Sequence, residues 1–245
     1  MKRFFRLSVM GCGLLALASC SIYHPQTVDI PLLEAPGETR VDAAIGVSTF
    51  IMVPTAVTLG ATASHAFNGW LGGQVHANYG GDNYYLQAAP GAYWAPAKSF
   101  RLEGYAGVGF GGSRGDQTPS SAAQDTAASG GHEWSGQFVV PFLQMNVGWR
   151  NVGPFEFAFG VKVGALMPHY TYTSYSDAER QTVSGEEHYS TTNALIEPQL
   201  QLRVGSDRVK YTLRVSMVGL SDLDNSSSKF IYSHLTLSNG LVFSF

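Results

Sequence analysis

Side chains capable of catalysis or metal binding are sparse in this chain. His234 with Ser233 or Ser238 offers a base and a hydroxyl nucleophile, but no catalytic motif surrounds them. A metal site needs convergent ligands, and the His, Asp and Glu residues of the polar stretches have no diagnostic spacing. These residues are His132, Glu133, Asp177, Glu179, Glu186, Glu187 and His188. We therefore expect a protein without catalytic activity, bound metal or cofactor.

The N-terminus carries the most specific chemical signal. Three basic residues, Lys2, Arg3 and Arg6, precede an apolar run from Leu7 to Ala18 that is too short to span a bilayer as a helix. The following Leu17-Ala18-Ser19-Cys20 resembles the lipobox of a bacterial lipoprotein signal, which implies cleavage after residue 19 by lipoprotein processing enzymes and acylation of the Cys20 thiol. The alternative is an ordinary secretory signal that ends in Cys.

Composition excludes several classes of protein. Removal of residues 1–19 leaves 12 Lys and Arg against 18 Asp and Glu, an acidic balance that argues against a nucleic-acid partner. The rest of the chain has no thiol besides Cys20 and therefore no disulfide. Charged residues are only 13% of the chain, yet no later stretch is long and apolar enough for a membrane helix. A closed β-barrel is the other structure that can cross a membrane.

Alternation of apolar and polar residues supports such a barrel. Residues 20–39 contain Pro25, Pro31 and Pro36 without sustained alternation, and we interpret them as an extended tether. Residues 40–245 contain ten segments with a period of two: 40–49, 53–64, 70–79, 84–95, 100–113, 133–149, 155–173, 189–204, 209–219 and 230–245. The sequence therefore predicts an all-β, antiparallel, up-and-down transmembrane barrel of about ten strands, with 8–12 possible.

The connections between these segments separate by parity. Connections two, four, six and eight are short, whereas five, seven and nine are long, as expected if both termini lie in the periplasm. The four Trp residues, with other aromatic residues, fall at segment ends, which predicts an aromatic belt at each membrane surface. In the sixth segment Phe138, Val140 and Phe142 share a face with polar residues, which predicts a bulge or a partly apolar lumen.

Charged residues of the segments lie opposite the apolar face. If the apolar face meets lipid, they line the lumen, where charges of opposite sign should pair. The predicted lumen charge network comprises Asp42, Arg101, Glu103, Glu156, Lys162, Glu197, Arg203, Lys210 and Arg214. A structural network is the favoured interpretation, and the selectivity lining of a narrow pore is the alternative.

The last residues, Ser238 to Phe245, contain Gly240, Phe243 and a terminal Phe245. This pattern resembles the C-terminal assembly signal of Gram-negative outer-membrane β-barrels. The resemblance extends over nearly the whole chain after the signal, by general pattern and without a family-specific motif. It implies an outer-membrane location, with outer-membrane lipids and the barrel assembly machinery as partners.

Function within this group would be structural, loop-mediated binding or narrow-pore transport. Two alternatives are a lipid-anchored carrier resembling lipocalins, whose apolar face would point inward around a ligand, and an outer-membrane hydrolase. Ten-stranded outer-membrane proteases place acidic pairs and an Asp-His pair on strand ends, and these positions cannot be aligned with this sequence. The oligomeric state is open.

Overall fold

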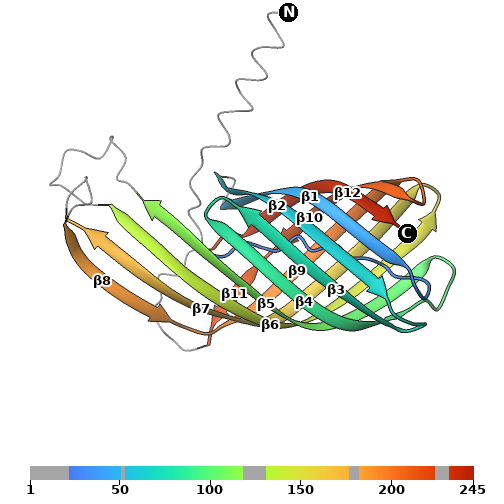
Figure 1. Ribbon diagram of the computed structural model, residues 1–245, viewed down its shortest axis with the longest axis horizontal. Coiled ribbons are helices and arrows are strands. Elements are labelled where there is room, and N and C mark those ends of the chain that lie inside the picture. Colours follow the sequence, from blue (N-terminus) through green and yellow to red (C-terminus); the bar gives the residue numbers. More distant parts are fainter. Residues whose placement is uncertain (1–21, 51–52, 118–130, 177–181, 224–231) are drawn as a thin grey trace, which may run out of the picture.

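The chain folds into an antiparallel β-barrel (Figure 1). The computed structural model describes residues 22–50, 53–117, 131–176, 182–223 and 232–245. Its strands are β1 (Thr39–Phe50), β2 (Val53–Ala66), β3 (Leu71–Gly80), β4 (Asn83–Trp94), β5 (Phe100–Gln117), β6 (His132–Val152), β7 (Phe155–Tyr175), β8 (Val183–Ser190), β9 (Asn193–Gly205), β10 (Val209–Met217), β11 (Gly219–Asp222) and β12 (Leu235–Ser244). Within these ranges no helix is long and apolar enough to cross a membrane.

Pairing of β7 with β9 closes the sheet. β8 continues β9 in register, because His169 on β7 lies opposite Ser190 and Leu166 lies opposite Asn193. β11 likewise continues β10 along the same edge of β9. Within the described residues the barrel wall therefore has ten strands, which confirms the predicted fold class.

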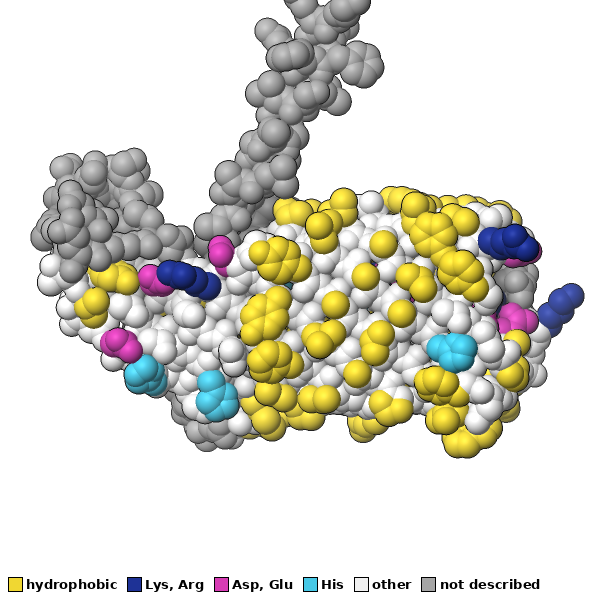
Figure 2. Space-filling view, in the orientation of Figure 1, with side chains coloured by type: hydrophobic (Ala, Val, Ile, Leu, Met, Phe, Trp, Pro, Cys, Tyr) yellow, Lys and Arg dark blue, Asp and Glu magenta, His cyan; other side chains and the backbone are white. Residues whose placement is uncertain are grey.

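Apolar side chains cover the outside of the barrel, and charged side chains point inward. On β7, Phe155, Phe157 and Phe159 are 37–49% exposed, whereas Glu156 and Lys162 are 2% and 4% exposed. Figure 2 shows the same pattern on one face: hydrophobic side chains spread over the wall, and charged ones lie toward the two ends. The lipocalin-like carrier is therefore wrong, because it requires the apolar face to line the interior.

The apolar surface ends at one level on three neighbouring strands. Val139 on β6 pairs with Phe110 on β5 and with Met167 on β7, and all three face outward. The next outward pair on β6 and β7, Gln137 with His169, is polar. We take this change as the upper boundary of the apolar belt.

Four strands continue past this boundary (Figure 1). We call this extension, formed by residues 111–117, 132–138, 168–175 and 183–190, the projecting sheet. Its outward face is polar, with Arg114 bound to Glu133 at 2.6 Å and the Thr171 hydroxyl 3.0 Å from His188 Nδ1. The projecting sheet therefore has the surface of a sheet in water, in contrast to the wall below it.

Aromatic residues mark both ends of the belt. Trp70, Trp94 and Trp149 are 41–63% exposed beside the short turns. Tyr79 and Tyr84 are exposed at the opposite end. Trp134 does not belong to this upper belt, although it was expected there. It lies on the inward face of the projecting sheet and is 2% exposed.

Exchange of Leu200 for Arg tests the lipid-facing assignment. Leu200 points outward on β9 and pairs with Phe159 and Val215. A cation near the middle of a bilayer costs about 2–4 kcal/mol, so Leu200→Arg should lower the free energy of unfolding in liposomes by about that amount. Val183→Arg, at an exposed position of β8 outside the belt, is the matched control and should change it little. Equal effects of the two substitutions would contradict the assignment.

Candidate functional site: a lumen filled by the chain itself

Residues 22–33 run through the inside of the barrel (Figure 1). We call this stretch the lumen segment. Nearly all of its side chains are buried, and those of Tyr23, Leu32 and Leu33 are 0% exposed. The segment enters at the end of the long connections, where Tyr23 bridges to Tyr232, and leaves at the short turns, where Leu33 packs with Ala66. The predicted tether at residues 20–39 is thus largely an interior element, and its described part begins at the end of the long connections.

Side chains of the wall bind the backbone of the lumen segment. The amide group of Gln201 accepts a hydrogen bond from Ile30 N at 3.1 Å and donates one to Ile30 O at 2.9 Å. Gln199 donates to Val28 O at 2.7 Å, and Glu103 accepts from Leu33 N at 2.7 Å. A buried backbone without strand neighbours needs such partners, because an unpaired peptide group is costly to bury. These contacts explain why amide side chains face the lumen.

Glycines of the wall make room for the apolar side chains of the segment. A Cβ atom at Gly148 would lie 2.6 Å from Leu32 Cδ2, and one at Gly160 would lie 3.0 Å from Ile30 Cδ1. A larger residue at Gly148 would therefore push the segment away from the wall. The apolar side chains of the lumen segment therefore fit closely against the inner surface of the barrel.

Ionic contacts hold the lower part of the segment. Asp29 accepts hydrogen bonds from Arg203 Nη2 at 2.7 Å to both carboxylate oxygens. Arg203 also binds Glu156 at 2.8 Å, and Glu156 in turn lies 3.1 Å from Arg40 Nη2. Arg214 contacts Asp29 at 3.5 Å. All of these side chains are at most 2% exposed, so their pairing is screened little by water.

A second group of polar contacts lies nearer the long connections. Lys162 Nζ lies 3.0 Å from Glu197 Oε2. The Tyr23 hydroxyl donates to Glu197 Oε1 at 2.8 Å, and Gln26 N donates to the same oxygen at 3.3 Å. Both ends of the lumen segment are thus bound to charged residues of the wall.

All nine residues of the predicted charge network are buried, at 0–5% exposure. Five further residues that were not predicted take part in these ion pairs: Arg40 and Arg150 on the strands, and Asp29, Glu34 and Glu38 before β1. Arg150 lies 2.8 Å from Glu38, and Arg101 lies 2.9 Å from Glu34. Alternation could have indicated Arg150, because Arg150 is the next inward position of β6 after Gly148. The predicted segment ended one residue too early, at residue 149.

Charge balance in the lumen depends on the residues before β1. Among the described residues, the cations that the strands turn inward are Arg40, Arg101, Arg150, Lys162, Arg203, Lys210 and Arg214, and the anions are Asp42, Glu103, Glu156 and Glu197. Asp29 adds one buried anion, and Glu34 and Glu38, with side chains 38% and 11% exposed, add two more at the short-turn end of the lumen. The wall alone would therefore enclose an excess of positive charge.

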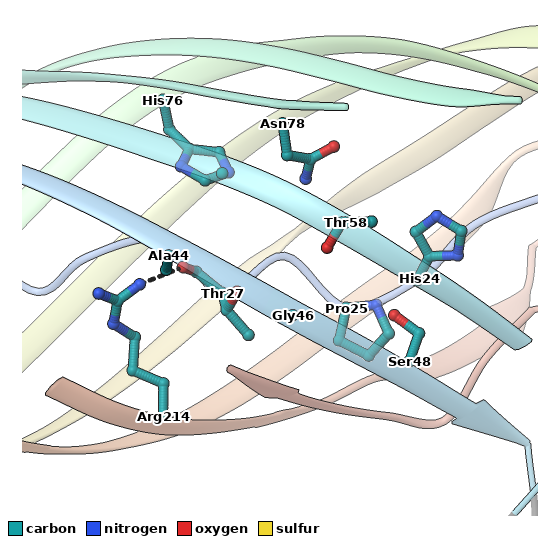
Figure 3. A pocket seen from close by; sticks show the side chains of 11 residues that line it. His24, Pro25, Thr27, Ala44, Gly46, Ser48, Thr58, His76, Asn78 and Arg214 are labelled. Atoms are coloured by element: carbon teal, nitrogen blue, oxygen red, sulfur yellow. Dashed lines mark hydrogen bonds between the residues drawn. The ribbon is translucent and has the colours of Figure 1, made fainter. Parts of the chain in front are cut away.

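Little space is left inside. Figure 3 shows His24, Pro25 and Thr27 of the lumen segment among side chains of β1, β2 and β3, with the guanidinium of Arg214 donating to Thr27 O at 3.0 Å. The cavity here has a volume of about 10 Å³, which is about the space of one water molecule. A second cavity, between Val28 and Lys162, has the same volume.

Apolar side chains fill the upper lumen. Phe138, Val140 and Phe142 point inward from β6 and are 0–5% exposed. Phe138 packs edge-on against Tyr23, with ring centroids 5.2 Å apart. β6 pairs with β5 without interruption across these residues, and its register with β7 is the same at Val139 and at Phe142. Of the two predictions for this segment, the partly apolar lumen is confirmed.

The remaining candidate residues do not converge on one site. Ser233 and Ser238 are buried, and Ser238 pairs with Gly46 and Arg214 of the neighbouring strands. His188 contacts Glu186 at 3.4 Å on the exposed outer face of the projecting sheet. No group of three or more His, Cys, Asp or Glu in the described ranges has the arrangement of a metal site. Cys20, Asp177 and Glu179 lie outside the described residues.

The C-terminal residues complete the barrel. Phe243 pairs with Val41 and is 36% exposed on the outer face, and Phe245 is 78% exposed at the short-turn end. Gly240 lies opposite Ala44, where an added Cβ would come within 2.2 Å of Ala43 O. The final strand therefore has a structural need for this glycine, independent of any assembly signal.

Comparison with solved structures places this fold among outer-membrane β-barrels. The outer membrane protease OmpT from Escherichia coli superposes with a TM-score of 0.56 at 10% identity, covering 85% of this chain and 94% of that chain. The KdgM porin (TM-score 0.40, 10% identity, 84% and 99% covered) and the translocator domain of the autotransporter NalP from Neisseria meningitidis (0.43, 10%, 100% and 95%) are also similar. The sequence matches no protein-family model and no curated protein sequence.

Arg203 should be the side chain whose loss is most costly. Arg203→Ala leaves Asp29 and Glu156 buried without their main partner, and breaking a buried ion pair in this way costs about 3–5 kcal/mol. We expect a loss of that size in the free energy of unfolding, measured by urea titration in liposomes. Arg203→Ala combined with Asp29→Ala should lose less than the sum of the two single variants, because the residues are coupled. Additive losses would show that the pair does not hold the segment.

Proposed function

We propose that this chain is a lipid-anchored protein of the Gram-negative outer membrane that does not conduct solutes and that acts by binding a partner outside the membrane. The burial of the lumen segment carries this proposal. A ten-stranded wall is wide enough to leave space beyond its own side chains, and here residues 22–33 occupy that space. A narrow-pore role is disfavoured for the same reason.

The projecting sheet is the proposed binding region. It extends past the apolar belt, and the connections between β5 and β6 and between β7 and β8 leave from its far end. β8 pairs with β7 along one edge, and no described strand pairs with its other edge. An open edge of this kind can receive an extended peptide as an added strand. The polar outer face suits a region that works in water.

Cys20 is the proposed point of lipid attachment. Its thiol would displace the phosphorylated headgroup of a phospholipid, forming a thioether to diacylglycerol while the thiol proton leaves with the headgroup. Hydrolysis of the peptide bond between Ser19 and Cys20 would then release residues 1–19. One lipid group adds to the hold that the barrel already has on the membrane.

Conductance across a planar bilayer tests the closed lumen. The intact protein should give no stable conductance steps, because the lumen segment and its partners fill the interior. Deletion of residues 22–34 should open a pore that prefers anions, since Asp29 and Glu34 leave with the segment while the cations of the wall stay. Heat-modifiable gel migration provides the control for folding of the deletion variant. Stable steps from the intact protein would contradict the proposal.

A further inference from the structure

The lumen segment has a direction, and this direction determines where the preceding chain emerges. Tyr23 lies at the end of the long connections, where its carbonyl accepts a hydrogen bond from Ser233 N at 2.9 Å. Leu33 lies at the opposite end with Ala66 and Tyr93. β1 then starts from the short turns and runs back toward the long connections. The chain therefore crosses the barrel once through the lumen before it enters the wall.

Ile22 already lies beyond the apolar belt. It is 3% exposed and packs with Trp134 and Tyr170 on the inward face of the projecting sheet. Both residues lie closer to the long connections than the pair Val139 and Met167, where the outward face of the wall changes from apolar to polar. The first described residue is thus above the level of the bilayer core on the side of the long connections.

Chain length restricts where Cys20 can reach. Three peptide steps separate it from Tyr23, and an extended chain spans at most about 10 Å over three steps. The apolar band of an outer-membrane barrel is about 25 Å tall. With residues 22–33 in place, Cys20 cannot return to the membrane surface on the side of the short turns.

We propose that the N-terminus of the processed chain lies at the outer face of the membrane, opposite its C-terminus, and that the lipid on Cys20 inserts into the outer leaflet. This inference rests on the proposed acylation and outer-membrane location. The partner is the acyl-chain layer of that leaflet around the rim of the barrel. The chain is then held near both faces of the membrane. Its lipid holds it at the outer face, and the contacts of Arg203 and Glu156 near the short turns hold it toward the inner face.

Epitope tags in otherwise intact chains test the direction of threading. One tag is placed between Ser21 and Ile22, a second between Ser120 and Ser121 in the long connection after β5, and a third between Asp207 and Arg208 in an exposed short turn. On intact cells an antibody should detect the first and second tags, and it should detect the third after permeabilisation. Heat-modifiable migration shows which tagged chains have folded.

Each outcome of this experiment is decisive. Detection of the first tag only after permeabilisation, together with the third, would overturn the proposal. If the first tag prevents folding, Ser21→Cys labelled with a membrane-impermeant maleimide replaces it. The label then reports on residue 21, because the acylated Cys20 thiol cannot react. Labelling on intact cells supports the proposal, and labelling only after permeabilisation overturns it.

Acylation is measured separately, so that its failure can be told from a failure of threading. Incorporation of an alkyne-labelled fatty acid should occur in the native chain and be lost in Cys20→Ala, while the first tag stays accessible in both. Absence of label from the native chain would overturn the outer-leaflet anchor and the proposed acylation, even with the tag at the surface. Surface detection of the third tag but not the second would instead show an inverted barrel and overturn the proposed orientation.

Discussion

The structure depends on the burial of more cations than anions in one closed lumen. Among the described residues, the strands point seven Lys and Arg side chains inward against four Asp and Glu, and water has little access to them. Such an excess is unfavourable in a medium of low polarity. The residues before β1 reduce this excess: Asp29 lies buried where Arg203 and Arg214 both contact it, and Glu34 and Glu38 pair with Arg101 and Arg150 at the short-turn end. The inward cations of the wall therefore need the anions of the residues before β1, and the path of the lumen segment brings Asp29 to them.

The barrel itself could be predicted from the sequence because its determinants are local. Residues on each strand alternate between the two faces with a period of two. On β7 this places Glu156 and Lys162 on one face and Phe155 and Phe159 on the other. The predicted segment 189–204 corresponds to β8 and β9, which together begin six residues earlier, at Val183, and end one residue later, at Gly205. Alternation continues past the membrane boundary on β6 and β7, so the projecting sheet could be anticipated only from the change of the outward residues from apolar to polar.

The lumen segment could not be predicted because its determinants are distant in sequence. It has two prolines, Pro25 and Pro31, and no period, since it binds side chains on all sides of the barrel instead of one neighbouring strand. Its hydrogen-bond partners Gln199, Gln201 and Arg203 lie about 170 residues further along the chain and meet it only in the folded barrel. A solvated tether and a buried segment can have the same composition. The inward-facing amide residues and glycines such as Gly148 were the available sequence features that could indicate a buried segment. They do not identify it, because the sequence alone does not show what these residues contact.

The lumen segment also connects the closed interior with the proposed binding region. Ile22 packs against Trp134 and Tyr170, and Tyr170 stacks on Tyr189 of β8 with ring centroids 4.9 Å apart. β8 is the edge of the projecting sheet and has few other packed neighbours, since its side chains are almost all exposed. An edge strand above the membrane is stable only if its inner face is packed. The segment that fills the lumen therefore also supports the proposed binding surface.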